Sequence, residues 1–138
     1  MTEKELSGIY DIEKRLQKLK SEIAELDFKI GTAGSAANGM PHGTGILKPV
    51  EALVIKKLDL CDKLYAEEIS RIKEEVKIRN YISAVDDEEI KLIMEFRFIY
   101  LMRWQDIGKE IKLDRTAVMK KLRRYLKNHS ADTFSAES

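Results

Sequence analysis

"IYDIEKRLQKLKSEIAELDFKI", residues 9–30, carries apolar side chains in alternating steps of three and four, and this spacing indicates the fold class. It is a heptad pattern, which is typical of a helix that packs lengthwise against another helix. An apolar stripe of this length needs a partner to cover it. The stripe consists of Ile9, Ile12, Leu16, Leu19, Ile23, Leu26 and Ile30.

The charges beside the stripe indicate the direction of that partner. In a parallel pair of identical helices, Arg15 would face Lys20, and Glu22 would face Asp27. Both pairs are like-charged, and their repulsion disfavours the parallel arrangement. The sequence therefore predicts an antiparallel partner, either in the same chain or exchanged between two chains.

A second helix, predicted from Val50 to Ile82, provides that partner. Its stripe is wide in the first half, which predicts burial on more than one side. We therefore expect an all-α fold, with a long antiparallel helical hairpin that resembles a coiled coil. The predicted stripe is Val54, Leu58, Cys61, Tyr65, Ile69, Ile72 and Val76, widened by Leu53, Leu60 and Leu64.

Residues 31–49 contain five of the seven glycines and both prolines, and they have no helical or strand period. This composition predicts a long flexible loop between the two helices. A glycine-rich segment beside Lys48 also suggests a phosphate-binding loop. The Gly-Lys-Ser/Thr ending and the preceding strand of such loops are missing, so we expect no nucleotide site there.

Composition excludes several other classes of protein. The single Cys61 cannot form an internal disulfide, and no cluster of Cys and His has the spacing of metal ligands, so no metal or cofactor is expected. No apolar run approaches the roughly 18 residues of a membrane span. We expect a cytoplasmic protein without membrane contact. No nucleophile, base and orienting group can be assembled from motifs, so an enzyme is not expected.

Positive charge is concentrated near the end of the chain. Residues 103–127 hold nine basic and three acidic side chains, whereas the whole chain has a net charge of only +1. A basic segment in a nearly neutral chain is typical of a protein that binds a polyanion. The alternative is a solvated helix face whose lysines serve solubility.

The same segment predicts two short helices joined by a tight turn. A third helix is expected to begin near "DDEE", with Asp86 as its N-cap, and to continue to about Leu101. A short helix follows from Trp104, with Ile107 and Ile111 facing inward. Asp114 then caps a helix whose inner residues are Val118, Leu122 and Tyr125, and Gly108 leaves room for the two helices to cross. Two such helices form a helix-turn-helix.

The predicted domains are therefore the helical hairpin, residues 1–82, and the helix-turn-helix domain, residues 83–128. Residues 129–138, "HSADTFSAES" after Asn128, have no period and are expected to be a disordered tail.

"FRFIYLMRWQDIGKEIKLDRTAVMKKLRRYL", residues 96–126, resembles the promoter-reading module of bacterial sigma factors, known as region 4. With the heptad helix and the loop "GMPHGTG", the whole chain looks like the short phage-encoded sigma-like regulators of Gram-positive bacteria and their prophages. In that family the turn usually has Gly where this chain has Lys112. A lysine with positive φ would cost on the order of 1 kcal/mol, so either the turn differs or it stores strain. The resemblance also implies that Trp104 closes the helical core rather than stacking on bases.

Residue chemistry and the resemblance together predict how double-stranded DNA would be bound. The start of the helix after Asp114 would enter the major groove, with Arg115 and Lys120 as donors to guanine, Thr116 as donor or acceptor, and Met119 against a thymine methyl. Phosphate contacts would set the register without reading bases. They are expected from Arg103, Lys112, Arg123, Arg124 and Lys127.

The expected function is a sequence-specific transcription regulator of phage late genes. Two alternatives stay open. One is the small subunit of a phage terminase, which also combines a helix-turn-helix with oligomerising helices. The other is an interaction module that docks on RNA polymerase. A homo-oligomer formed through the helical hairpin is compatible with all three.

Overall fold

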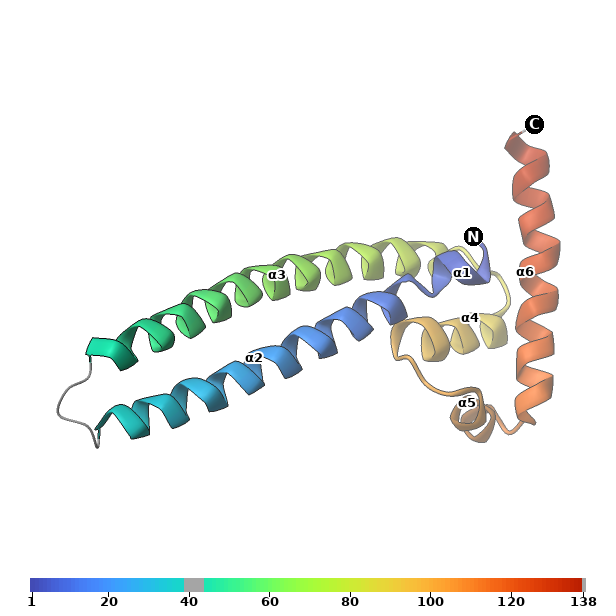
Figure 1. Cartoon of the computed structure of the whole chain (residues 1–138). Helices are drawn as coiled ribbons and strands as arrows, with labels where there is room; N and C mark the ends of the chain where they lie inside the picture. Colours follow the sequence, from blue (N-terminus) through green and yellow to red (C-terminus); the bar gives the residue numbers. More distant parts are fainter. Residues whose placement is uncertain (39–43, 138) are drawn as a thin grey trace. The chain divides into compact units, whose positions relative to one another are not determined.

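The computed structural model describes residues 1–38 and 44–137, and it places the side chains of residues 1–33 and 49–129. These residues are almost entirely helical and contain no strand, so the predicted all-α class is confirmed (Figure 1). The elements are α1 (Glu3–Leu6), α2 (Gly8–Asn38), α3 (Thr44–Ser83), α4 (Glu88–Met94), the π-helical turn η1 (Glu95–Ile99), α5 (Trp104–Ile111) and α6 (Arg115–Glu137).

Helix replaces most of the loop predicted for residues 31–49. α2 continues to Asn38 and α3 begins at Thr44, whereas residues 39–43 lie outside the described residues. The loop prediction was wrong because extending an existing helix adds one hydrogen bond for each residue ordered, and this gain outweighs the low helix propensity of the glycines. The segment "GTAGSAAN" also contains three alanines, the best helix formers. Pro49 lies inside α3 and removes one backbone donor there.

The predicted disordered tail also differs from the structure. α6 continues through Glu137 and so includes most of the residues expected to form the tail. Polar sequence without a period is compatible with helix when a packed helix precedes it, for the same cooperative reason.

The chain forms two compact units, and their boundary differs from the one predicted at residue 82. The multihelical unit comprises Met1–Asp11 and Arg71–Ser138, and the two-helix unit comprises Ile12–Ser70. The difference arises because Leu6 and Ile9 share a core with Ile78 and Ile82, so both the N-terminus and the end of α3 belong with the C-terminal helices.

Within the two-helix unit, α2 and α3 lie side by side and run in opposite directions (Figure 1). Arg15 near the start of α2 forms an ion pair of 2.9 Å with Glu67 late in α3. Asp27 pairs at 2.5 Å with Lys57, which lies earlier in α3. The buried apolar residues of this unit are Ile12, Leu16, Leu26 and Leu60.

The face of α3 that meets α2 is not the predicted one. Leu58 and Tyr65 from the predicted stripe are 59% and 67% exposed, whereas Leu60, expected only to widen the stripe, is buried. Cys61, expected to be buried, is half-exposed. Both faces of α3 have heptad spacing, so apolar spacing alone does not distinguish them. The ion pairs do, because Lys57 and Glu67 follow the same three-and-four spacing as Leu60.

The multihelical unit has a dense apolar core contributed by every one of its helical elements. Ile93, Met94 and Ile107 have no exposed surface, and Phe98 is only 2% exposed. These residues pack α4, η1, α5 and α6 together in one core. The core comprises Leu6, Ile9, Ile78, Ile82, Val85, Ile90, Ile93, Met94, Phe98, Ile99, Ile107, Val118, Leu122 and Leu126.

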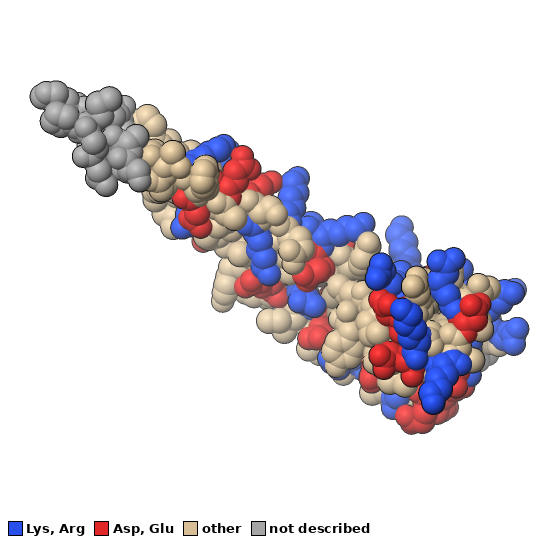
Figure 2. Space-filling view, turned by 90° about the horizontal axis from the view of Figure 1, so that it is seen from below, with Lys and Arg blue, Asp and Glu red and all other residues tan. Residues whose placement is uncertain are grey.

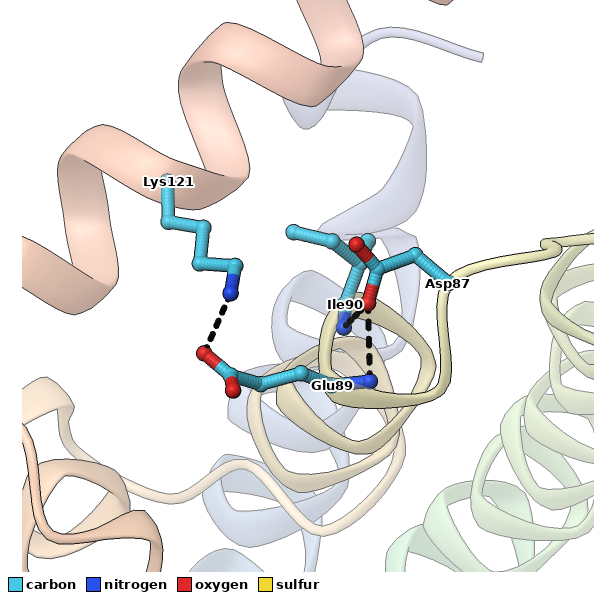
Figure 3. Close-up of polar contacts among 4 residues, drawn as sticks. All are labelled: Asp87, Glu89, Ile90 and Lys121. Atoms are coloured by element: carbon cyan, nitrogen blue, oxygen red, sulfur yellow. Dashed lines mark hydrogen bonds and ion pairs between the residues drawn. The ribbon is translucent and has the colours of Figure 1, made fainter.

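α4 begins one residue later than predicted, and its cap is Asp87 rather than Asp86. The Asp87 Oδ1 atom accepts hydrogen bonds from the backbone N–H groups of Glu89, at 2.9 Å, and Ile90, at 3.2 Å (Figure 3). This register buries Ile90 beneath the cap.

The helix expected to reach Leu101 widens into a π-helical turn and ends at Ile99. The Tyr100 N–H donates to the Glu95 carbonyl five residues earlier, at 3.0 Å. Leu101 then adopts a φ of 57°, a left-handed conformation that β-carbon sterics disfavour outside glycine. The turn redirects the chain toward α5.

Candidate nucleic-acid interface

α5 and α6 form a compact pair whose inner faces are apolar. Ile107 of α5 and Val118 and Leu122 of α6 have no exposed surface. These are the residues that the sequence predicted to face inward. Tyr125, also predicted there, is half-buried, and Leu126 is buried instead as the next inner residue of α6.

The turn between the two helices contains the lysine that stands where the resembling family has glycine. Lys112 has φ 60° and ψ 42°, the left-handed conformation. Of the two possibilities left open by the sequence, the structure has the strained one. A neighbouring hydrogen bond from the Leu113 N–H to the Gly108 carbonyl, at 2.9 Å, closes the turn.

Gly108 is required by this turn. A β-carbon at residue 108 would lie 2.5 Å from the Leu113 carbonyl oxygen, closer than real side chains approach. The sequence predicted that Gly108 gives room for helix crossing. The close neighbour is in fact the backbone of the turn itself.

Asp114 caps α6 as predicted. Its Oδ2 atom accepts a hydrogen bond from the Thr116 N–H at 3.2 Å, and the Val118 N–H donates to its carbonyl at 3.0 Å. The cap satisfies backbone donors that have no partner within the helix, and it places Arg115 and Thr116 in the first exposed turn.

The face of α6 opposite its buried stripe is polar and cationic. Thr116, Lys120 and Lys127 are exposed on it, and Arg124 is exposed beside them. Arg115 is exposed in the first turn, whereas Met119 is half-buried. Figure 2 shows Lys and Arg side chains among acidic ones on one face of the molecule. Of the predicted readers, Thr116 and Lys120 therefore share one accessible face, and Arg115 is exposed about 100° around the helix from Thr116.

Two basic side chains of α6 are held by carboxylates from other helices. Lys121 forms an ion pair with Glu89 of α4 at 2.5 Å (Figure 3). Arg123, predicted to contact phosphate, pairs with Glu3 of α1 at 3.3 Å. Residues 3 and 123 are far apart in the sequence, and only the shared core of the multihelical unit brings them together, so no local pattern could have indicated this contact.

The two remaining predicted phosphate contacts lie outside α6. Arg103 precedes α5, is exposed, and pairs with Asp106 at 3.3 Å. Lys112 is exposed in the turn. Because the Arg103 side chain is 82% exposed, its ion pair is weak and can exchange for another anion.

Trp104 is partly buried and packs against the core, as predicted. The Arg97 guanidinium lies 4.5 Å from the centre of the indole ring. Arg97 also donates a hydrogen bond to the Met102 carbonyl at 3.0 Å. This arrangement secures the start of α5 to η1.

A groove lies between α6 and the start of α4, beside the exposed cationic face of α6. Tyr125 forms part of its wall, and its ring stacks on His129 with centroids 3.7 Å apart. Burial raises the pKa of Tyr125 above that of an exposed tyrosine. The groove is lined by Asp87, Ile90, Ala117, Lys120, Lys121, Arg124, Tyr125, Asn128 and His129.

Among the described residues, no helix has the length and apolar character needed to cross a lipid bilayer. Within the same residues, no three side chains of His, Cys, Asp or Glu lie close enough to hold a metal ion together.

Comparison of the chain with protein-family models, with curated proteins and with solved structures finds no match in any of the three.

Proposed function

We propose that the chain is a sequence-specific DNA-binding transcription regulator of the region 4-like type, in which α5 and α6 form a helix-turn-helix and α6 reads the major groove. In this proposal the two-helix unit is an antiparallel coiled-coil hairpin. The observation that carries the proposal is the division of α6 into two faces. Val118 and Leu122 are fully buried, whereas Thr116 and Lys120 on the opposite side are exposed. Arg115 is exposed in the first turn, where no preceding turn covers it.

The exposed side chains match the chemistry of base edges. Arg115 and Lys120 donate to the O6 and N7 acceptors of guanine, and the Thr116 hydroxyl serves either as donor or as acceptor. Met119 is half-buried, so only part of its side chain remains for contact with a thymine methyl. We expect this contact to be the weakest of the four.

Phosphate contacts come from the exposed cations around the readers. Lys112, Arg124 and Lys127 are exposed, and Arg103 can exchange its surface ion pair for a phosphate. Arg123 must first leave Glu3, so its net contribution to affinity is smaller. The proposed activity is binding without catalysis or a cofactor.

The first test is selection of bound sites from random duplex DNA, followed by affinity measurements over a range of salt concentrations. If about five phosphates are neutralised, the logarithm of the association constant falls with the logarithm of salt concentration at a slope of roughly −4 to −5. Salt-independent binding would favour docking on a protein such as RNA polymerase. No selected sequence and no duplex binding would overturn the proposal.

A second test uses two neighbouring lysines. Lys120 is exposed on the outward face, and the described residues contain no ion pair to it, whereas Lys121 is held by Glu89. Lys120→Gln should weaken binding to the selected site by about 1 to 3 kcal/mol and relax base preference. Lys121→Gln removes the same charge and should change specific binding far less.

Equal losses for the two variants, on selected and random DNA alike, would show that α6 does not read bases. A ring of many subunits in solution would favour the small terminase subunit instead, because packaging proteins assemble in that way, whereas a small oligomer agrees with a regulator.

A further inference from the structure

One face of α3 carries large apolar side chains that the chain itself leaves uncovered. We call Ile55, Leu58, Tyr65 and Ile69 the outer stripe. Ile55, Leu58 and Tyr65 are 67%, 59% and 67% exposed. Ile69 is half-buried. Several exposed large apolar side chains aligned on one helix face typically mark an interaction site.

The outer stripe has its own heptad spacing. Its residues, with Asp62 between Leu58 and Tyr65, follow one another in steps of three and four, and the spacing continues to Ile72 and Val76, which are 62% and 54% exposed. At 100° per residue, the stripe lies on the side of α3 opposite Leu60 and Lys57, which face α2. α2 therefore cannot cover it.

We propose that the outer stripe binds the outer stripe of a second copy of this chain, with the two α3 helices antiparallel. The occupant is identified by matching pairs along the stripe. When Leu58 of one copy faces Ile69 of the other, Asp62 faces Tyr65 of the second copy. Leu58 then meets Ile69 and Ile55 meets Ile72 of the second copy, and the Tyr65 hydroxyl can donate a hydrogen bond to the Asp62 carboxylate.

Parallel pairing is disfavoured by the same residues. It would place Asp62 against Asp62 of the second copy in the middle of the seam, where like charges lose solvent. An antiparallel pair shifted by one heptad would bring Glu68 against Glu68 of the second copy. A shift of two heptads would bring Glu68 against Glu75. Only the first register keeps carboxylates apart along the stripe.

Disulfide trapping between single-cysteine chains tests the register. The native thiol is removed by Cys61→Ser, and Leu58→Cys and Ile69→Cys are made in separate chains, one of which carries a size tag. Only residues that face each other directly come within reach of a disulfide. We expect a crosslinked heterodimer when the two chains are mixed and oxidised, and little product from either chain alone. Lys63→Cys, off the stripe, serves as the control and should not crosslink.

Mass in solution tests the interface itself. The wild-type chain should reach about twice its 15.9 kDa as its concentration rises. Leu58→Asp should weaken self-association by at least about tenfold, because a carboxylate would be buried without a partner. Its helical circular dichroism should be unchanged, since Leu58 is exposed in the single chain. Ser70→Asp adds the same charge off the stripe and should leave the dimer intact.

Three results would overturn the proposal. They are a chain that stays monomeric at all concentrations, crosslinking of Leu58→Cys to itself, which indicates parallel helices, and a Leu58→Asp variant that associates as well as the wild type. None of these results depends on DNA. The dimer proposal can therefore be wrong while the proposed function holds, and the proposed function can be wrong while the dimer forms.

Discussion

The two units bury their apolar residues very differently. In the multihelical unit, large side chains such as Phe98 and Met94 have almost no contact with water. In the two-helix unit, Phe28 is 74% exposed and Ile55 is 67% exposed. The multihelical unit thus has a dense core of its own, and its exposed apolar side chains, such as Ile72 and Tyr100, lie outside that core. The two-helix unit presents apolar side chains that another molecule would have to cover, which accords with its proposed self-association.

Phenylalanine residues in the two units should respond very differently to the same substitution. Phe98→Ala should lower the free energy of unfolding by about 3 to 5 kcal/mol, because it leaves a cavity in the multihelical core. Phe28→Ala removes the same atoms from an exposed position and should change the free energy of unfolding by no more than about 0.5 kcal/mol. Urea unfolding followed by circular dichroism measures both. Similar losses would mean that Phe28 is covered in solution.

The same substitution at two glycines, one in each unit, should change the free energy of unfolding in opposite directions. Gly108→Ala should destabilise the chain by about 1 to 3 kcal/mol, since its β-carbon would strike the Leu113 carbonyl oxygen. Gly31→Ala lies in α2 with no atom within 4 Å of the new carbon. It should stabilise helix by about 0.5 to 1 kcal/mol. Thermal unfolding gives both values, and a stabilising Gly108→Ala would show that the turn differs in solution.

Lys112→Gly should raise the stability of the multihelical unit by about 1 kcal/mol, because glycine tolerates the left-handed conformation. Lys112→Ala removes the same charge but keeps the strain. The two variants should therefore bind DNA equally and differ in unfolding free energy. If their stabilities agree, residue 112 is not left-handed in solution.

The smallest expected effect concerns the ion pair between Lys57 and Asp27. A hydrogen bond and Coulomb attraction to Asp27 raise the pKa of Lys57 above 10.5. The stabilisation should be fully present below the pKa of lysine in the unfolded chain and lost as the pH rises through the higher folded value. The difference in stability between the wild type and Lys57→Gln should therefore shrink above pH 10.5. A difference that is independent of pH would mean that the pair does not form.

Local sequence predicted the parts of the fold that depend on local chemistry. The cap at Asp114 and the inward residues Ile107, Val118 and Leu122 follow from short-range rules, and the structure confirms them. The packing of Trp104 against the core, which only the family resemblance implies, is also present in the structure. The positions of the cationic side chains on α6 were likewise predictable from helical periodicity. Their role in binding DNA stays a prediction.

The errors have a common physical origin in cooperativity and long-range packing. Helix at residues 31–38 and after residue 129 depends on propagation from packed neighbours. The face of α3 that meets α2 depends on which charges find partners across the pair. The contact of Arg123 with Glu3 depends on a core shared by the two ends of the chain. None of these is encoded in a short window of sequence.

The division of the chain has a consequence for the order of folding. The two-helix unit is an insertion of residues 12–70 into the multihelical unit, so Leu6 and Ile9 can pack with Ile78 and Ile82 only when the ends of this 59-residue insertion come together. Closing a flexible loop of that length costs about 3.6 kcal/mol by polymer theory, beyond a constant term. Early pairing of α2 with α3 shortens the effective loop and brings Asp11 and Arg71 together before the core forms. The insertion would then act as a folding template, and a chain in which it is replaced by a glycine-serine linker of equal length should refold more slowly.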